Sequence, residues 1–167
     1  MGPRRGGGDE GGVLRAVVDT STLVGQARRR DLQEAAAIGL FEAIWSPWIV
    51  AELNRVLTWR GIERSGGDLS AAHHKRLSVS SKAMMEYLTA TFTVVDPKPP
   101  HPPPWDDLAD PGDVPIWAAA KASGATYVVS ENTDDYPPRQ PDGRNAHEGI
   151  ECLGGDAFLR LVTGALA

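Results

Sequence analysis

Carboxylate side chains recur in this sequence where short apolar runs end or helical segments begin. Asp19 closes the apolar run 13–19 (VLRAVVD), and the acidic segment 130–138 (SENTDDYPP) directly follows a second apolar run, 125–129 (ATYVV). In parallel sheets, ligands bind beyond the carboxyl ends of the strands. Carboxylates that crowd there repel one another unless water, a hydrogen-bond donor or a cation satisfies them. The carboxylates that we expect to converge are Asp19, Glu52, Asp113 and Asp135.

Each of these residues also has a plain structural role open to it. Asp113 can be a helix N-cap, Glu52 a solvated helix acid, and Asp19 a turn residue. Glu52 lies three residues after Ile49 and four before Val56, so a helix would place it near the apolar face, where a carboxylate needs a partner or a cation. Oxygen ligands with few histidines suit Mg²⁺ or Mn²⁺ rather than zinc. The coincidence of several such carboxylates favours a cation site.

Strands alternate with helices along the chain. Apolar, β-branched runs predict strands at residues 13–19, 43–46, 92–96, 125–130 and 149–154. Composition and capping residues predict helices at 31–43 (N-cap Asp31), from Ser46 and Pro47 onwards, at 68–91 (N-cap Asp68 or Ser70), from Gly112 or Asp113 to Gly124, and at 155–166. The pattern is typical of an α/β fold, with a parallel sheet of about five strands covered on both faces.

Length and composition indicate a single domain and limit the classes of protein to which the chain can belong. The 167 residues fit one domain with a real core, and we expect residues 1–12 to be a flexible leader and 13–167 a single domain. The net charge of −5 lacks the basic footprint of most nucleic-acid binders, although cations in an acidic cleft would reconcile it with a phosphate substrate. The single Cys152 excludes an intrachain disulfide. No apolar run approaches the ~20 residues of a membrane span, so we expect a cytoplasmic protein without membrane contact.

Three blocks, in order, resemble the PIN-domain family. They are VVDTSTLV (17–24), SPWIVAELNRVL (46–57) and DPGDVPIWAAAKASGATYVVSENTDDYP (110–137). The likeness extends from residue 13 to about 163 and is closest to VapC-type toxins of toxin–antitoxin systems, in the branch with asparagine in the last motif. The third block is the most specific. The resemblance implies a three-layer α/β/α sandwich and a Mg²⁺- or Mn²⁺-dependent endoribonuclease that cleaves single-stranded RNA.

The resemblance also implies a role for each site residue. The catalytic positions of the family are taken by Asp19, Glu52, Asp113, Asn132 and Asp135. Asp19 and Asp113 would be the central metal ligands, and Glu52 and Asp135 would complete the set. A second group would hold water, carboxylates or phosphate by hydrogen bonds, namely Asn132, Ser21 and Ser130. Glu131 replaces the usual glycine of the last motif and has no assigned role.

Substrate and partner contacts are less specific in the sequence. Arg28, Arg29 and Arg30 follow the first predicted strand and could grip phosphates or form a solvated run. Trp105, in the proline-rich loop, is the aromatic residue that we expect to stack on a base. The resemblance implies a small antitoxin with a basic side chain in the acidic cleft, and a homodimer. The contacts of the unusual loop 97–104 cannot be carried over from the family.

Three alternatives remain open from the sequence. A catalytically degenerate PIN-like domain would bind RNA or a protein without cleaving. A haloacid-dehalogenase-like phosphatase would need a second acid two residues after its nucleophile, where this chain has Ser21. A nucleotide-binding fold would need a glycine-rich loop after the first strand, and none is present. The presence of the expected acids favours the metal-dependent nuclease.

Overall fold

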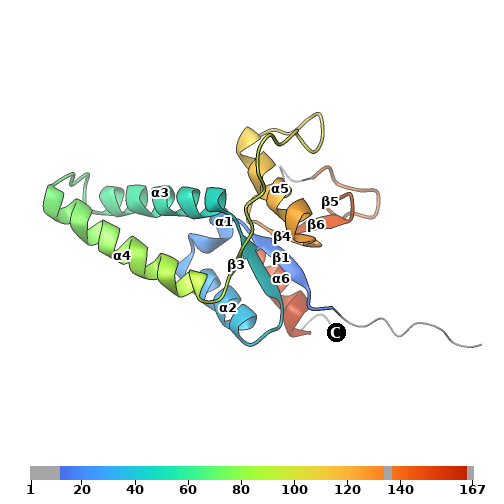
Figure 1. The fold of residues 1–167 in the computed structure, drawn as a ribbon, viewed down its shortest axis with the longest axis horizontal. Coiled ribbons are helices and arrows are strands. Elements are labelled where there is room, and N and C mark those ends of the chain that lie inside the picture. Colours follow the sequence, from blue (N-terminus) through green and yellow to red (C-terminus); the bar gives the residue numbers. More distant parts are fainter. Residues whose placement is uncertain (1–11, 134–136, 165–167) are drawn as a thin grey trace, which may run out of the picture.

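The computed structural model describes residues 12–133 and 137–164. A mostly parallel sheet lies at the centre of these residues (Figure 1). Its strands are β1 (Arg15–Val18), β2 (Glu42–Trp45), β3 (Thr93–Val94), β4 (Tyr127–Val129), β5 (Ala146–His147) and β6 (Ile150–Leu153). The strand order among these described residues is β3-β2-β1-β4-β6-β5. All neighbouring pairs are parallel except β5 with β6.

Helices cover both faces of this sheet. They are α1 (Thr20–Leu23), α2 (Gln26–Ala37), α3 (Pro47–Arg64), α4 (Ala71–Thr89), the 3₁₀ turn η1 (Pro111–Asp113), α5 (Val114–Ser123) and α6 (Gly155–Thr163). Helix α5 packs on β1, β2 and β4 from one side, whereas α2 and α6 lie together on the other (Figure 1). The predicted α/β/α sandwich is therefore confirmed. Within the described ranges, no helix is long and apolar enough to span a lipid bilayer.

The core is built on the two central strands. Ala16, Val17 and Val18 of β1 and Val128 and Val129 of β4 are completely inaccessible to solvent. Continuous apolar runs of this kind are typical of parallel strands that are buried on both faces. Both strands end abruptly in polar residues, so the apolar core stops at one edge of the sheet and the candidate site begins there.

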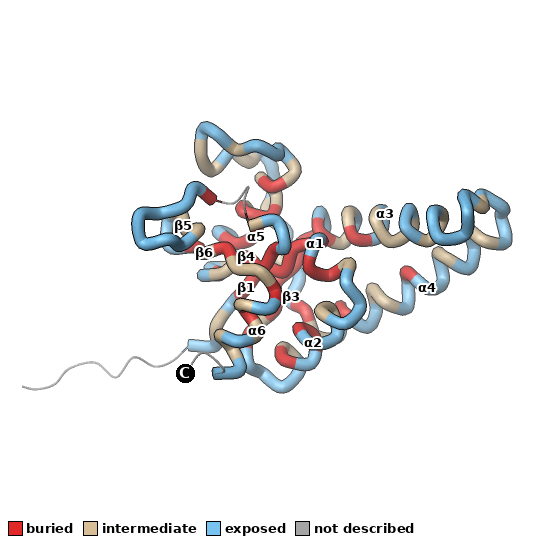
Figure 2. Tube along the Cα trace, turned by 180° about the vertical axis from the view of Figure 1, so that it is seen from behind, coloured by how far each residue is buried: buried red, intermediate tan, exposed pale blue. Residues whose placement is uncertain are grey.

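Helices α3 and α4 form a long antiparallel hairpin that extends away from the sheet (Figure 1). Only the part of the hairpin near the sheet carries buried side chains, Ile49 and Leu53 from α3 and Ser81 and Leu88 from α4, whereas the far end is mostly exposed (Figure 2). The predicted N-cap of α3 is confirmed, because the Ser46 hydroxyl accepts a hydrogen bond from the Ile49 amide at 3.3 Å. The base of α3 thereby places Glu52 near the sheet edge.

The predicted helix at 31–43 was wrong at both ends. Helix α2 runs from Gln26 to Ala37 with Gly25 at its N-cap, so Asp31 lies inside the helix. The residues from Gln26 to Arg30 include good helix formers that extend it toward β1. Gly39, with a φ of +80°, turns the chain, and β2 begins at Glu42.

The prediction of about five strands missed β5. Strands β5 and β6 form an antiparallel hairpin whose turn residues, Glu148 and Gly149, have φ values of 49° and 80°. Two consecutive residues with positive φ are typical of a type I′ turn, and a glycine in second place is its usual sequence signal. The other predicted strands and the α5 C-cap at Gly124 are confirmed.

Candidate active site

Asp19 occupies the centre of the polar edge where β1 ends. Its amide donates to the Val129 carbonyl at 2.9 Å, which extends the pairing of β1 with β4 by one residue. The residue is only 6% exposed, and it stands at the N-cap of the short helix α1 without capping it through its side chain. A buried carboxylate is costly unless hydrogen bonds or a cation compensate it. The prediction that the first strand delivers Asp19 to this edge holds.

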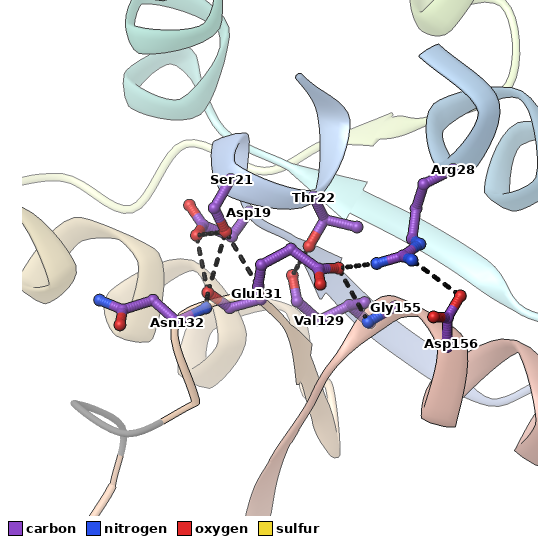
Figure 3. Close-up of polar contacts among 10 residues, drawn as sticks. Asp19, Ser21, Thr22, Arg28, Val129, Glu131, Asn132, Gly155 and Asp156 are labelled. Atoms are coloured by element: carbon purple, nitrogen blue, oxygen red, sulfur yellow. Dashed lines mark hydrogen bonds and ion pairs between the residues drawn. The ribbon is translucent and has the colours of Figure 1, made fainter. Parts of the chain in front are cut away.

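Two serine hydroxyls converge on a single oxygen of Asp19 (Figure 3). Asp19 Oδ2 accepts from Ser21 Oγ at 2.7 Å and from Ser130 Oγ at 2.9 Å. Each serine oxygen accepts in turn from a backbone amide, Ser21 from Glu131 N–H at 3.0 Å and Ser130 from Asn132 N–H at 3.2 Å. Two amide–hydroxyl–carboxylate chains therefore tie Asp19 to residues 130–132, and such chains polarise and strengthen one another.

Glu52 reaches the same edge from α3. Its Oε2 accepts a hydrogen bond from Thr20 Oγ1 at 2.8 Å, and Thr20 directly follows Asp19. Arg55, one turn later on the same helix, approaches Glu52 Oε1 at 3.9 Å. Because Arg55 is largely exposed, this ion pair is screened by solvent and contributes little. The structure brings Glu52 beside Asp19 through Thr20.

Asp113 lies at the junction of η1 and α5. The residue is 8% exposed, and the turn that carries it is closed by Asp110, whose side chain accepts from the Gly112 amide at 2.8 Å. The negative charge of Asp113 acts on the Cys152 thiol, and so does that of Asp19. Both carboxylates are therefore near enough to the Cys152 thiol for their charges to raise its pKa.

The Cys152 thiol of β6 is buried and lies in an acidic environment. Burial raises the pKa of Cys152 to about 12, with the negative charges of Asp19, Asp113 and Glu151 acting in the same direction. The thiol is consequently protonated and inert at neutral pH. Cys152 is buried in the core, as a small apolar residue would be.

The last predicted motif is only partly described. Asp135 lies outside the described residues. Asn132 is exposed, and its side chain extends from the loop on the side opposite to Glu131 (Figure 3). The amide of Asn132 contributes to the site through the backbone, by way of Ser130. Its predicted side-chain role stays a prediction.

A PIN domain profile matches residues 15–134, which is more than half of the chain and includes β1, the α3–α4 hairpin and β4. The chain belongs to the PIN-domain family. A search of curated proteins found no match. PIN domains are generally nucleases that use divalent metal ions, so membership supports a hydrolase.

The three arginines of this PIN domain have different surroundings. Arg28 forms ion pairs with Glu131 and, at 2.8 Å, with Asp156, and hydrogen bonding to Glu131 raises the pKa of its guanidinium against partial burial. Arg29 donates to the Leu23 carbonyl at 2.8 Å, and burial lowers its pKa. Arg30 is exposed and lies near acids of its own helix. Phosphate binding by the three arginines stays a prediction.

Trp105 packs on other aromatic rings. Its ring meets Trp117 edge-on with centroids 5.1 Å apart, and His147 at 5.4 Å. Trp117 is buried, so these contacts attach the proline-rich loop to α5 and β5. Base stacking by Trp105 stays a prediction, and a base could stack only on the part of the ring that Trp117 and His147 do not cover.

Glu131 is the residue whose place the sequence did not indicate. Its Oε1 accepts from Arg28 and, at 3.1 Å, from the Gly155 amide at the start of α6 (Figure 3). Partial burial raises the pKa of Glu131, but these hydrogen bonds outweigh it, so the net shift is downward. The charged side chain thus connects the site loop to α2 and α6.

The carboxylate oxygens at this edge are of the type that binds divalent cations. Asp19 forms no ion pair in the described part of the chain, its Oδ2 is taken by two hydroxyls, and Oδ1 has no hydrogen bond there. Carboxylate oxygens of this kind match the preference of Mg²⁺ and Mn²⁺. Within the described ranges, however, no three histidine, cysteine, aspartate or glutamate side chains are grouped closely enough to form a complete metal site. The remaining predicted ligand, Asp135, lies outside them.

Proposed function

We propose that this PIN domain is a Mg²⁺- or Mn²⁺-dependent endoribonuclease that cleaves single-stranded RNA. One observation carries the proposal: a buried Asp19 carboxylate, held on one oxygen by two hydroxyls, at the strand edge of a PIN-domain chain. A divalent cation bound there would screen the phosphodiester charge and lower the pKa of a bound water. The acidity of the chain then suits a phosphate substrate, because the cation inverts the local charge.

The chain's own residues have distinct tasks in this proposal. Asp19 and Asp113 offer buried carboxylate oxygens to the cation, and Glu52 approaches through Thr20. Ser21 and Ser130 fix the orientation of the Asp19 carboxylate through Oδ2, and Oδ1 has no hydrogen bond in the described part of the chain. This orientation matters because removal of a side chain that hydrogen-bonds to a metal ligand typically lowers metal affinity or activity by about 10- to 100-fold.

Cleavage assays with active-site variants test the function. We expect purified protein to cut transfer, ribosomal or messenger RNA with Mn²⁺ or Mg²⁺ and to leave RNA intact in a chelator. Asp19→Asn and Asp113→Asn should abolish cleavage while circular dichroism and the thermal midpoint show a folded protein. If a folded Asp113→Asn protein cuts RNA like wild type, the assignment is wrong.

A second candidate is a degenerate PIN-like domain that binds RNA or a protein without cleavage. The absence of a complete three-ligand group within the described ranges favours it. This candidate predicts weak Mn²⁺ binding and unchanged RNA at every metal concentration. Calorimetric titration with Mn²⁺, run beside the cleavage gel, separates the two candidates.

We also propose a VapC-like role, in the cytoplasm, as the toxin of a type II toxin–antitoxin pair. The proposal rests on the sequence motifs, which imply a small antitoxin that inserts a basic side chain into the acidic edge, and a homodimer. Three apolar residues of α4 could serve a dimer face, but Leu88 is buried in the core, and Met84 and Met85 are partly buried against it. Size-exclusion chromatography giving a strict monomer at high concentration would count against the dimer.

A further inference from the structure

The loop from Ser130 to Asn132 holds Asp19 in place, although little of it is anchored by apolar packing. Two of its amides support the serines that hold Asp19 Oδ2. Ser130 is buried, but Glu131 and Asn132 are exposed. A loop with exposed residues keeps a fixed position only if other contacts restrain it. The Ser130 amide donates to the Leu153 carbonyl at 3.0 Å, and the Asn145 side-chain amide donates to the Thr133 carbonyl at 2.8 Å, so both ends of the segment are held. Between these two points, the Glu131 side chain supplies a further restraint.

Glu131 is fastened from two different helices. Arg28 of α2 donates to Glu131 Oε1, and the Gly155 amide at the start of α6 donates to the same oxygen at 3.1 Å. Arg28 is itself held on its other side by Asp156, at 2.8 Å. The exposed side-chain fractions of Arg28 and Glu131 are 26% and 41%, so the pair is shielded in part from solvent.

Gly155 gives Arg28 the space to make these contacts. A Cβ atom on residue 155 would lie 2.1 Å from Arg28 Cδ and 2.9 Å from Glu131 Oε1. Any side chain there would force the arginine stem out of its position. The packing of α6 and the charge pair are therefore one arrangement, built from segments that are far apart in the sequence.

We propose that Arg28 and Glu131 are positioning residues of the active site. Together they clamp the 130–132 loop, so its amides keep Ser21 and Ser130 aimed at Asp19. The inference rests on the proposed nuclease function and assigns Arg28 a role other than phosphate binding. Loss of either side chain lets the loop move, and Asp19 loses its fixed orientation without a change in the residues that meet RNA.

Steady-state cleavage kinetics distinguish the clamp from phosphate binding. We expect Arg28→Ala and Glu131→Ala each to lower kcat by about 10- to 100-fold while KM changes little. The double variant should lose no more than the more severe single variant, because both remove one unit. Gly155→Ala should give the same phenotype by displacing Arg28, and Glu131→Gln, whose amide oxygen can still accept, should retain more activity than Glu131→Ala.

The matched control is Lys121→Ala. Lys121 and Glu148 form an ion pair of similar reach, at 2.7 Å, between α5 and the β5–β6 turn at the other end of the sheet. Its loss should leave kcat and KM unchanged. A raised KM with unchanged kcat for Arg28→Ala, and normal kinetics for Glu131→Ala, would overturn the clamp and favour phosphate binding.

Amide hydrogen exchange tests the clamp without RNA. In Arg28→Ala and Glu131→Ala, the amides of residues 131 and 132 should exchange roughly 2- to 10-fold faster than in wild type, because each loses most of a hydrogen bond to serine. Lys121→Ala should leave them unchanged. If wild type cuts no RNA, the nuclease proposal fails, and exchange still decides on the clamp. Unchanged exchange in both clamp variants would overturn it.

Discussion

Raising the pH perturbs one buried group beside the candidate active site, the Cys152 thiol. Its pKa rises from a model-peptide value of 9.0 to about 12 in the folded chain. The folded protein therefore binds the thiol proton more tightly than the unfolded chain does. This contribution to stability is complete below pH 9 and is lost as the pH rises toward 12.

The size of the effect follows from the pKa difference. Each pKa unit corresponds to about 1.4 kcal/mol, so the full gap amounts to roughly 4 kcal/mol. At pH 10 only roughly 1–2 kcal/mol of it is lost, because the pH then lies a single unit above the pKa of the unfolded thiol. In a domain of this length, such a loss lowers the thermal midpoint by roughly 3–6 °C.

The assay compares wild type with Cys152→Ala in urea unfolding between pH 7.5 and 10. Tyrosine and lysine titrate in both proteins, so the difference between their unfolding free energies isolates the thiol. The cavity left by the substitution adds an offset that does not depend on pH. In wild type, alkylation by iodoacetamide at pH 8 should be about a thousandfold slower than for a free cysteine, because the thiolate fraction falls by that factor.

Two results would refute this reasoning. The first is a wild-type-minus-variant difference that stays constant from pH 7.5 to 10. The second is alkylation of folded Cys152 at the rate of an exposed thiol. Either result would mean that water reaches the β6 side of the candidate site. The conclusion that Asp19 and Asp113 lie in buried, acidic surroundings would then be wrong.

Two further predictions concern the hydroxyl contacts and a helix end. Ser130→Ala should lower the free energy of unfolding by about 1.5–3 kcal/mol, because a buried hydroxyl bonded to a carboxylate is lost, and Ser21→Ala, at an exposed residue, should cost less in chemical denaturation. Equal stability of Ser130→Ala and wild type would contradict the contact. Gly124→Ala, at a φ of 67°, should cost about 1–2 kcal/mol. Gly154→Ala, at a φ of −64° with open space, should cost less, because only the N-cap preference of α6 for glycine over alanine is lost. Equal losses by thermal unfolding would refute the role of the positive φ.

Much of the fold and the positions of several candidate site residues could be predicted from the sequence, because the signals that place them are local. Apolar runs mark β1 and β4, and the polar residue that ends each run must lie at the sheet edge. That rule places Asp19 and Ser130 correctly. Helical spacing from Ile49 likewise aims Glu52 toward the edge, where Thr20 meets it.

The rest depends on contacts between distant segments. Glu131 resembles a surface acid in its own segment, and only the packing of α2 against α6 brings Arg28 and the Gly155 amide to it. Asp31 is a residue type that is common at N-caps, yet α2 begins earlier, with Gly25 as its N-cap and the residues from Gln26 onward already helical. The turn at Glu148 and Gly149 did carry a local signal, a glycine in the second position of a two-residue turn.

The way the core ends explains why the candidate site depends on polar contacts. The residues that follow Val18 and Val129 are the polar Asp19 and Ser130, so apolar packing does not set the directions of their side chains. Direction is supplied instead by hydrogen bonds: two hydroxyls on Asp19, two amides on those hydroxyls, and a charge pair on the loop that carries the amides. The Ser130–Asp19 hydrogen bond is buried, whereas the other links are partly accessible to water and each contributes modestly by itself. Their joint effect is to hold one carboxylate oxygen in a fixed direction, which is the property that binding a cation at this edge would require.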